Sequence, residues 1–269
     1  MKSIFWILFV MLALNLIYTV FYLNQFNNIN GIFSVYYISS GHFGVSLVIL
    51  SLYLLLFGTV ELYINKKVLI IGLFLGLFAV YTSAARSPIL ALFIVGLYFM
   101  VLKKKIKYIY TFVLMLLLFL LLIYVSKQVL QVENAFIERN YSGIFEGNAS
   151  GRAPYIERAI SIFKDNVLIG GRVMYEDGMY PHNIFLELGM AGGLLLLLLF
   201  GLIFYTLLKN CRSFLNLTRS NFFILPLFGL WLQYFILTQT SNNIYSNPEF
   251  WYFSSVIIGI SLKTYNEKT

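Results

Sequence analysis

The chain has 269 residues, of which 60% are hydrophobic and 11% are charged, and its mean hydropathy is +0.82. This composition excludes an ordinary soluble domain and a disordered chain, and it is typical of a protein whose solvent is mostly lipid. The formal net charge of +8 comes from lysines and arginines between apolar segments, so we attribute it to contact with anionic membrane lipids and not to nucleic-acid binding.

About eight apolar segments follow one another along the chain, each near the length that a helix needs to cross a hydrocarbon core of about 30 Å. They cover residues 4–23, 43–64, 68–82, 88–102, 106–125, 183–208, 222–238 and 250–262. The runs are continuously apolar and lack the alternation of barrel strands, and a helix satisfies its own backbone groups inside lipid. The sequence therefore predicts an all-α fold, a polytopic transmembrane helix bundle that forms a single integral membrane domain over residues 1–269.

Basic residues gather at alternate ends of these segments, and this pattern predicts the orientation in the membrane. The connections that carry them contain Lys2, Lys66, Lys67, Lys103, Lys104, Lys105, Lys107, Lys209, Arg212, Arg219, Lys263 and Lys268. We expect this side to be cytoplasmic, with both termini inside and with an uncleaved first helix, because no small-residue cleavage site precedes Asn24. The single cysteine, Cys211, lies on the same reducing side, so no disulfide or zinc framework is expected.

The largest outer connection covers residues 126–181 and is inserted between the fifth and sixth predicted membrane helices. Its basic and acidic residues nearly balance and it is not of low complexity, so we expect it to fold. Pro154 suits the first turn of an amphipathic helix whose apolar residues recur at helical spacing, and Asn166 is expected to end that helix. Arg152 would lie at its N-terminus, where the helix dipole and free N–H groups favour an anion.

Arg86 lies in a short outer turn between segments 68–82 and 88–102. Each segment has about 15 residues and would span roughly 22 Å, so the turn is expected below the outer membrane surface. An arginine at this depth is costly and is usually retained to meet an anion. The alternative is an ordinary helix-end residue whose guanidinium reaches lipid phosphates.

His182 and Asn183 open the next apolar segment on the same outer side, and Glu187 follows about one turn later. A histidine that titrates near neutrality is a reasonable general base, although a helix-terminal histidine can also simply bond to nearby backbone. Asn183 is expected to orient the helix start or a sugar hydroxyl. Glu187 would orient the imidazole or pair with an arginine. Arg172 would contact phosphate or sugar, or remain a solvated loop charge.

The order and spacing of three pieces resemble the O-antigen ligase and O-antigen polymerase family of bacterial polysaccharide assembly. The pieces are the arginine turn with the helix after it (82–92), Ser150-Gly151-Arg152 with the amphipathic run that follows, and Pro181-His182-Asn183 leading into Gly189 and Gly192-Gly193. The resemblance covers about residues 41–208. Members of that family usually have more helices before the matched region, so we expect a short member or a chain that lacks its amino-terminal part.

The resemblance implies a C-type membrane glycosyltransferase fold and an inverting, metal-independent transfer without a cofactor. It implies a polyprenyl-pyrophosphate-linked oligosaccharide as donor and a glycan or lipid as acceptor, in the making of O-antigen, lipopolysaccharide, capsule or exopolysaccharide. His182, Arg152 and Arg86 would be catalytic, and Arg172, Asn183 and Glu187 would bind substrate. The protein would lie in the bacterial cytoplasmic membrane with its site facing the exterior, in contact with membrane lipids and with polysaccharide assembly and chain-length proteins.

Two other classes of protein stay open at this point. One is a transporter or flippase of a lipid-linked or anionic solute, although the sequence shows no internal repeat and no paired Gly/Pro-interrupted helices, which are the usual marks of alternating access. The other is a non-catalytic scaffold of a polysaccharide assembly complex. We expect a transferase to bring Arg86, Arg152 and His182 around one pocket.

Overall fold

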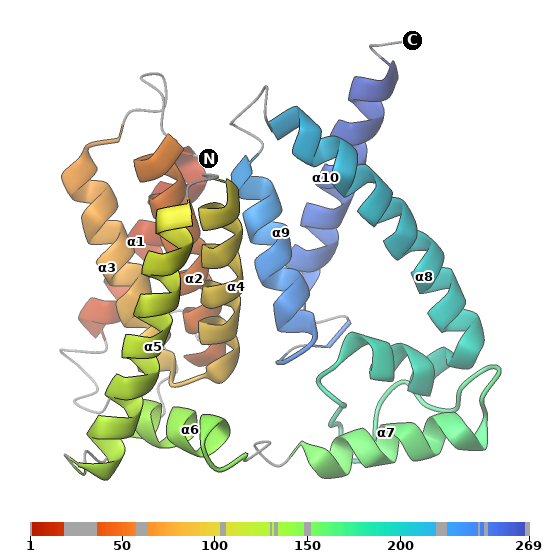
Figure 1. Ribbon diagram of the computed structural model, residues 1–269. Coiled ribbons are helices and arrows are strands. Elements are labelled where there is room, and N and C mark those ends of the chain that lie inside the picture. Colours follow the sequence, from red (N-terminus) through yellow and green to blue (C-terminus); the bar gives the residue numbers. More distant parts are fainter. Residues whose placement is uncertain are drawn as a thin grey trace. The chain divides into compact units, whose positions relative to one another are not determined.

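The computed structural model describes residues 2–18, 37–57, 64–102, 106–129, 131, 134–147, 152–218, 225–241, 243–244 and 247–266. Within these ranges every regular element is a helix, which confirms the predicted all-α class (Figure 1). The helices are α1 (Lys2–Tyr18), α2 (Tyr37–Phe57), α3 (Lys66–Ser83), α4 (Arg86–Leu102), α5 (Ile106–Gln128), α6 (Ala135–Ile144), α7 (Ala153–Asp165), α8 (Ile184–Thr218), α9 (Leu225–Thr238) and α10 (Pro248–Asn266).

Each predicted apolar segment overlaps one of these helices, but only three described stretches are both long and apolar enough to cross a membrane. These are Ser39–Leu56, Lys66–Ser83 and Ile184–Asn210. Shorter apolar helices include Lys2–Tyr18, Arg86–Met100 and Leu225–Thr238. The expected eight crossings and their orientation therefore stay predictions. Several residues used for them lie outside the described ranges, namely Asn24, Lys103, Lys104, Lys105, Arg219 and Lys268, as does the Ser150-Gly151 pair before Arg152.

The chain divides into two compact units, Met1–Asn148 and Ala149–Thr269. The boundary lies within the 126–181 segment that was expected to be one outer loop. In the first unit α1 to α5 run along one another, and the short helix α6 lies across the ends of α3, α4 and α5 (Figure 1). The sequence did not predict α6.

Small residues bring α2 and α3 into close contact. A Cβ atom added to Gly44 would lie 2.6 Å from the carbonyl oxygen of Gly76, and one added to Gly76 would lie 2.6 Å from that of Gly44. Such close backbone approach is a common way for membrane helices to associate, because van der Waals contact replaces the hydrophobic driving force that lipid does not supply. The packing holds α3 in place, and with it the turn that leads to Arg86.

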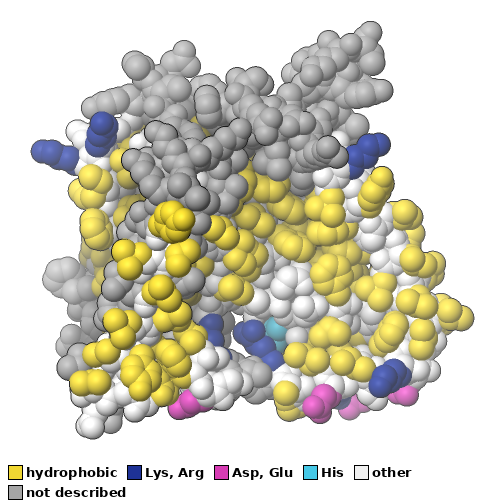
Figure 2. Space-filling model, in the orientation of Figure 1, with side chains coloured by type: hydrophobic (Ala, Val, Ile, Leu, Met, Phe, Trp, Pro, Cys, Tyr) yellow, Lys and Arg dark blue, Asp and Glu magenta, His cyan; other side chains and the backbone are white. Residues whose placement is uncertain are grey.

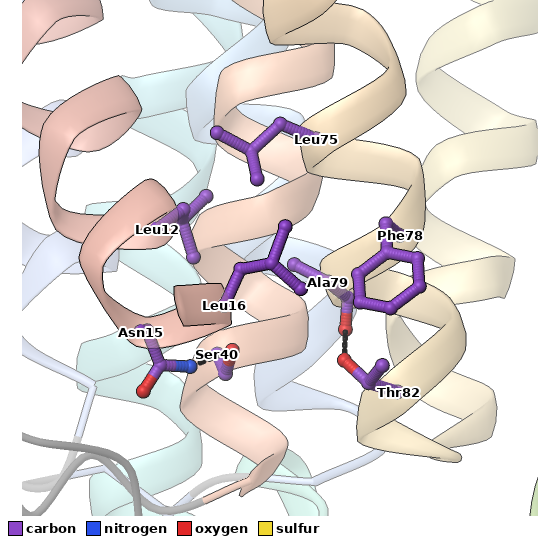
Figure 3. A pocket seen from close by; sticks show the side chains of 8 residues that line it. All are labelled: Leu12, Asn15, Leu16, Ser40, Leu75, Phe78, Ala79 and Thr82. Carbon is purple, nitrogen blue, oxygen red and sulfur yellow. Dashed lines mark hydrogen bonds between the residues drawn. The ribbon is translucent and has the colours of Figure 1, made fainter. Parts of the chain in front are cut away.

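A small cavity lies among α1, α2 and α3 (Figure 3). It is lined by Leu12, Asn15, Leu16, Ser40, Leu75, Phe78, Ala79 and Thr82, and its volume is about 10 Å³. Asn15 Nδ2 donates to Ser40 Oγ at 3.4 Å on its wall. The space is of the order of a single water molecule, so it is not a binding site for a sugar or a phosphate.

In the second unit α8 is broken at Gly192 and Gly193, and the break is closed by the segment 167–172 that follows α7. Leu194 N and Leu195 N, which a helix break deprives of partners, donate to the carbonyl oxygens of Val167 (2.8 Å) and Leu168 (3.2 Å). In return Met190 O accepts from Gly171 N at 2.9 Å and Arg172 N at 3.2 Å. The short first part of α8 is thereby fixed against the loop.

A small core completes this fastening. Ala159 of α7, Tyr175 of the following loop and Met190 of α8 are all buried and pack together. The helix α7 begins beside Pro154, and Asn166 caps its C-terminal end, so the predicted amphipathic helix is confirmed. Together these contacts position the start of α8, where His182 and Asn183 lie.

Hydrophobic side chains cover much of the flanks of the helices, and charged side chains gather at their ends (Figure 2). On α8 the apolar residues Leu198 and Leu202 are 67% and 65% exposed. Exposed leucines of this density on a long apolar helix are costly in water and favourable in hydrocarbon. The fold is that of a helical membrane protein.

Candidate functional site

His182 lies directly before α8 and has a left-handed backbone conformation with φ of +54°. This conformation is uncommon for a residue with a side chain and tends to be retained where function requires it. The side chain is half-buried, and its Nδ1 atom lies 3.0 Å from the carbonyl oxygen of Ser241. The ring of Tyr180 lies at a centroid distance of 4.3 Å. The imidazole is therefore held on two sides.

Asn183 caps α8 and also ties it to the end of α9. Its Oδ1 accepts from the backbone N–H groups of Phe185 at 3.1 Å and Leu186 at 3.2 Å, as an N-cap residue does. Its Nδ2 donates to Gln239 Oε1 at 3.1 Å. Asn183 was expected to orient either the helix start or a sugar hydroxyl. Its hydrogen bonds in the structure are those that orient the helix start.

Glu187 is almost completely buried, with 2% of its surface exposed. Its Oε2 accepts from the backbone N–H of Ile244 at 3.0 Å, and its Oε1 has no hydrogen-bond partner within the described residues. The expected contact with the imidazole or with an arginine is not recorded there. Glu187 instead holds the segment 239–244, of which the structure describes residues 239–241 and 243–244. The start of α8 is thus bonded to that segment at His182, Asn183 and Glu187.

The electrostatic surroundings of His182 favour the neutral imidazole. Burial lowers its pKa below the ordinary value of 6.5, and the nearby positive charge of Arg152 lowers it further, while the bond to Ser241 acts in the opposite direction. A carbonyl oxygen only accepts hydrogen bonds, so Nδ1 carries the proton in the neutral ring. The other nitrogen, Nε2, is then left as a proton acceptor.

Arg152 is the N-cap residue of α7 and its side chain is half-buried. It makes no side-chain capping bond to that helix. The charge of Arg152 and the N-terminal end of the α7 dipole are two sources of positive potential at this helix end. The structure thus brings Arg152 and His182 into electrostatic contact within one unit.

Arg172 lies in a different cluster. Its Nη1 donates to Glu176 Oε1, and this pairing lowers the pKa of the Glu176 carboxyl group. Arg158 stands over the Tyr175 ring at 4.7 Å and pairs with Asp177 at 3.5 Å. These exposed charges border an open cavity of about 390 Å³ lined by Arg158, Ile162, Asp165, Asn166, Gly171, Arg172 and Glu176. Arg172 is thus engaged in a surface ion-pair network.

Arg86 is the first residue of α4, in the first unit. Its Nη2 donates to Ser142 Oγ of α6 at 3.0 Å, and its guanidinium lies against the backbone of Gly143. Arg152 and His182 belong to the second unit, and the expected convergence of all three residues on one cavity stays a prediction.

Two parts of this arrangement were not foreseen from the sequence. One is α6, which contacts Arg86; its ten residues are amphipathic and Asn134 stands before it as an N-cap, so a local signal was available. The other is the segment 239–244 that binds the start of α8. Its polar residues Gln239, Thr240, Ser241 and Asn243 interrupt two apolar segments at an end predicted to face outward, and this was the available signal. Among the described residues no group of three or more His, Cys, Asp or Glu side chains gathers as a metal site would require.

Fold and site together define a helical membrane protein in which a half-buried histidine lies directly before the broken helix α8, and the charge of Arg152, at the start of α7, acts on it. Residues 71–201 match the family model described as O-antigen ligase. This match assigns the region to the O-antigen ligase family, and it includes Arg86, Arg152, Arg172, His182, Asn183 and Glu187. The resemblance inferred from the sequence is confirmed. Neither a search of curated proteins nor a search of solved structures gave a match.

Proposed function

We propose that this protein is an inverting membrane glycosyltransferase that moves an oligosaccharide from a polyprenyl pyrophosphate to a glycan or lipid acceptor. The single observation that carries the proposal is the Nδ1 bond of His182 to the Ser241 carbonyl oxygen beside the charge of Arg152. It supplies a neutral imidazole with one free acceptor nitrogen next to a cation. The family match supports a role of ligase or polymerase type in polysaccharide assembly.

In the proposed step His182 Nε2 takes the proton of the acceptor hydroxyl group. The hydroxyl oxygen then forms a bond to the anomeric carbon of the donor sugar, and the bond from that carbon to the pyrophosphate oxygen breaks. The leaving pyrophosphate keeps the electron pair, and attack from the opposite face inverts the anomeric centre. General-base help of this kind contributes about 100- to 10,000-fold to a rate.

Arg152 has two roles in this proposal. Its guanidinium binds oxygen atoms of the leaving pyrophosphate with charge-assisted hydrogen bonds, and arginine stays protonated while it does so. Its charge also adds to burial in lowering the pKa of His182, which favours the unprotonated imidazole before the acceptor binds. Arg86 is proposed to bind a phosphate group of the donor, and Asn183 and Glu187 are proposed to position the histidine through the segment 239–244.

The proposed reaction takes place at the outer side of the bacterial cytoplasmic membrane, with membrane lipids around the helices. The donor is lipid-linked, and the acceptor is a growing glycan for a polymerase or a lipid core for a ligase. A transporter or a scaffold would bind the same donor without forming a glycosidic bond, so product formation separates the classes.

The test uses the purified protein in lipid nanodiscs with a polyprenyl-pyrophosphate-linked oligosaccharide, scored for chain growth and for transfer to an added acceptor. The informative variant is His182→Asn, because asparagine tolerates the left-handed backbone better than most residues but is not a base at this position. We expect transfer to fall about 100-fold or more while donor binding is kept. Near-normal turnover of His182→Asn, or donor binding without any product in the wild type, would reject the proposal.

A further inference from the structure

Helix α6 is firmly attached to the first unit. Asn134 caps it by accepting from Phe136 N at 2.8 Å, and Lys127 of α5 pairs with Glu138. The Phe136 ring packs on Tyr81 of α3 at a centroid distance of 4.8 Å. The helix is thus positioned from both neighbours, and the side chains on its inner face have fixed places relative to α3 and α5.

The face that α6 turns toward Arg86 is defined by two contacts. Ser142 Oγ accepts from Arg86 Nη2 at 3.0 Å, and a Cβ atom at Gly143 would lie 2.5 Å from the Arg86 Cζ and Nη1 atoms. The guanidinium therefore lies in direct contact with the helix backbone at a position where only glycine leaves it room. The contacts with Ser142 and Gly143 hold the guanidinium group of Arg86 against α6.

Arg139 lies on that same face. Residues three and four apart are neighbours on a helix surface, so position 139 adjoins both Ser142 and Gly143. The positive charge of Arg139 acts on Arg86, and its side chain is exposed. Two like charges held near each other repel. An anion that binds between them attracts both and offsets this repulsion.

We propose that Arg139 is a second donor-binding guanidinium, which together with Arg86 holds a phosphate group of the lipid-linked pyrophosphate. The inference rests on the proposed function, because it takes the anion to be the donor's pyrophosphate. The required chemistry is a phosphate oxygen at the membrane surface, where two guanidinium groups each make paired N–H···O contacts. A phospholipid headgroup offers the same oxygen atoms, so the test must separate the two sources.

The experiment measures binding of a polyprenyl pyrophosphate without sugar to the full-length protein in nanodiscs of neutral phosphatidylcholine. A parallel series uses nanodiscs that contain phosphatidylglycerol. The variants are Arg139→Gln, Arg139→Lys, Arg86→Gln and the double variant. The matched control is Lys164→Gln, which removes an exposed cation from the polar face of α7.

We expect Arg139→Gln to weaken binding about 10- to 100-fold, as the loss of a charged hydrogen bond does. Arg139→Lys should recover part of the affinity, since it keeps the charge without the paired contacts. The double variant should lose less than the product of the two single losses, because both side chains bind one group. Lys164→Gln should bind like the wild type.

Unchanged binding in Arg139→Gln together with weakened binding in Arg86→Gln would overturn the inference. The inference would also be overturned if phosphatidylglycerol competed with the polyprenyl pyrophosphate in the wild type and lowered its affinity as much as Arg139→Gln does. The ligand of Arg139 would then be a lipid headgroup. If both Arg139→Gln and Arg139→Lys lost binding and also had a lower melting temperature, Arg139 would be a structural residue and the inference would be wrong. The assay contains no acceptor and measures donor binding only, so its outcome does not depend on whether the protein transfers sugar. If Arg139→Gln binds the donor and transfers sugar normally, the inference is refuted and the proposed function is not.

Discussion

The Nδ1 atom of His182 lies 3.0 Å from the carbonyl oxygen of Ser241, which is 59 residues later in the chain. The bond selects the tautomer, because only a protonated Nδ1 can donate to a carbonyl oxygen. It also gives the ring a fixed direction. The segment 239–244 is therefore part of the site even though no side chain in it needs to react.

The acidic limb of the pH profile should lie lower than for an ordinary histidine. Burial and Arg152 both lower the pKa of His182 from 6.5, and a base acts in its deprotonated form. We expect kcat/KM to be constant near neutrality and to fall on acidification only below pH 6.5. In Arg152→Gln the residual activity should show this limb at higher pH, because the charge that opposes protonation is gone.

The chain contains two histidines, so the same pKa can be followed directly by NMR of ¹³C-labelled imidazole rings in the unreacted protein. His42→Gln assigns the two signals. A His182 signal that titrates above the ordinary histidine range, or one that does not respond to Arg152→Gln, would contradict the electrostatic account.

Glu187→Leu should disturb the site without touching the substrate. The change removes the acceptor of the Ile244 N–H, and a buried donor left without a hydrogen-bond partner costs about 1–3 kcal/mol. We expect a lower melting temperature and a lower kcat, because the segment that carries the Ser241 carbonyl is released. Glu187→Gln keeps an acceptor oxygen and should stay close to the wild type in both measurements. Equal behaviour of the two variants would show that the bond to Ile244 does not position the site.

Gly193→Ala should destabilise the second unit. Gly193 has φ of +59° and ψ of −153°, and an added Cβ atom would lie 2.5 Å from the Val167 carbonyl oxygen. A backbone conformation that is essentially restricted to glycine costs about 1–3 kcal/mol with a side chain, before the clash is counted. Thermal unfolding in detergent measures the loss. Gly201→Ala in the same helix is the control, since a Cβ atom there meets nothing within 4 Å.

Arginine should not be replaceable by lysine at position 86 if guanidinium groups perform the work of a metal. We expect transfer to survive a strong chelator and Arg86→Lys to lose most activity, because an ammonium group cannot make two parallel bonds to a phosphate. Retained folding of the variant is checked by its melting temperature. A requirement for added magnesium or manganese would contradict this prediction, and so would a fully active lysine variant.

Much of the helical content follows from local sequence. Continuous apolar runs determine α1 to α5 and α8 to α10, because a helix is the way for one segment to satisfy its own backbone in lipid. Pro154 and the spacing of the apolar residues up to Phe163 determine α7 in the same local way. The order, spacing and predicted outer location of the pieces that carry Arg86, Arg152 and His182 supported the resemblance to the O-antigen ligase family, since these features need no knowledge of contacts.

The contacts that build the site were decided by tertiary structure. Helix α6 is amphipathic and capped by Asn134, but its place across α3 and α5 depends on contacts with those helices, such as Lys127 with Glu138 and Tyr81 with Phe136. The break of α8 is tolerated because the loop at Val167 and Leu168 supplies the missing acceptors. Likewise the bonds from His182, Asn183 and Glu187 reach a segment more than 50 residues away. Sequence periodicity reports which face of an element is apolar, whereas pairing between distant polar groups depends on how the helices pack, and the tautomer of His182 is a consequence of that packing alone.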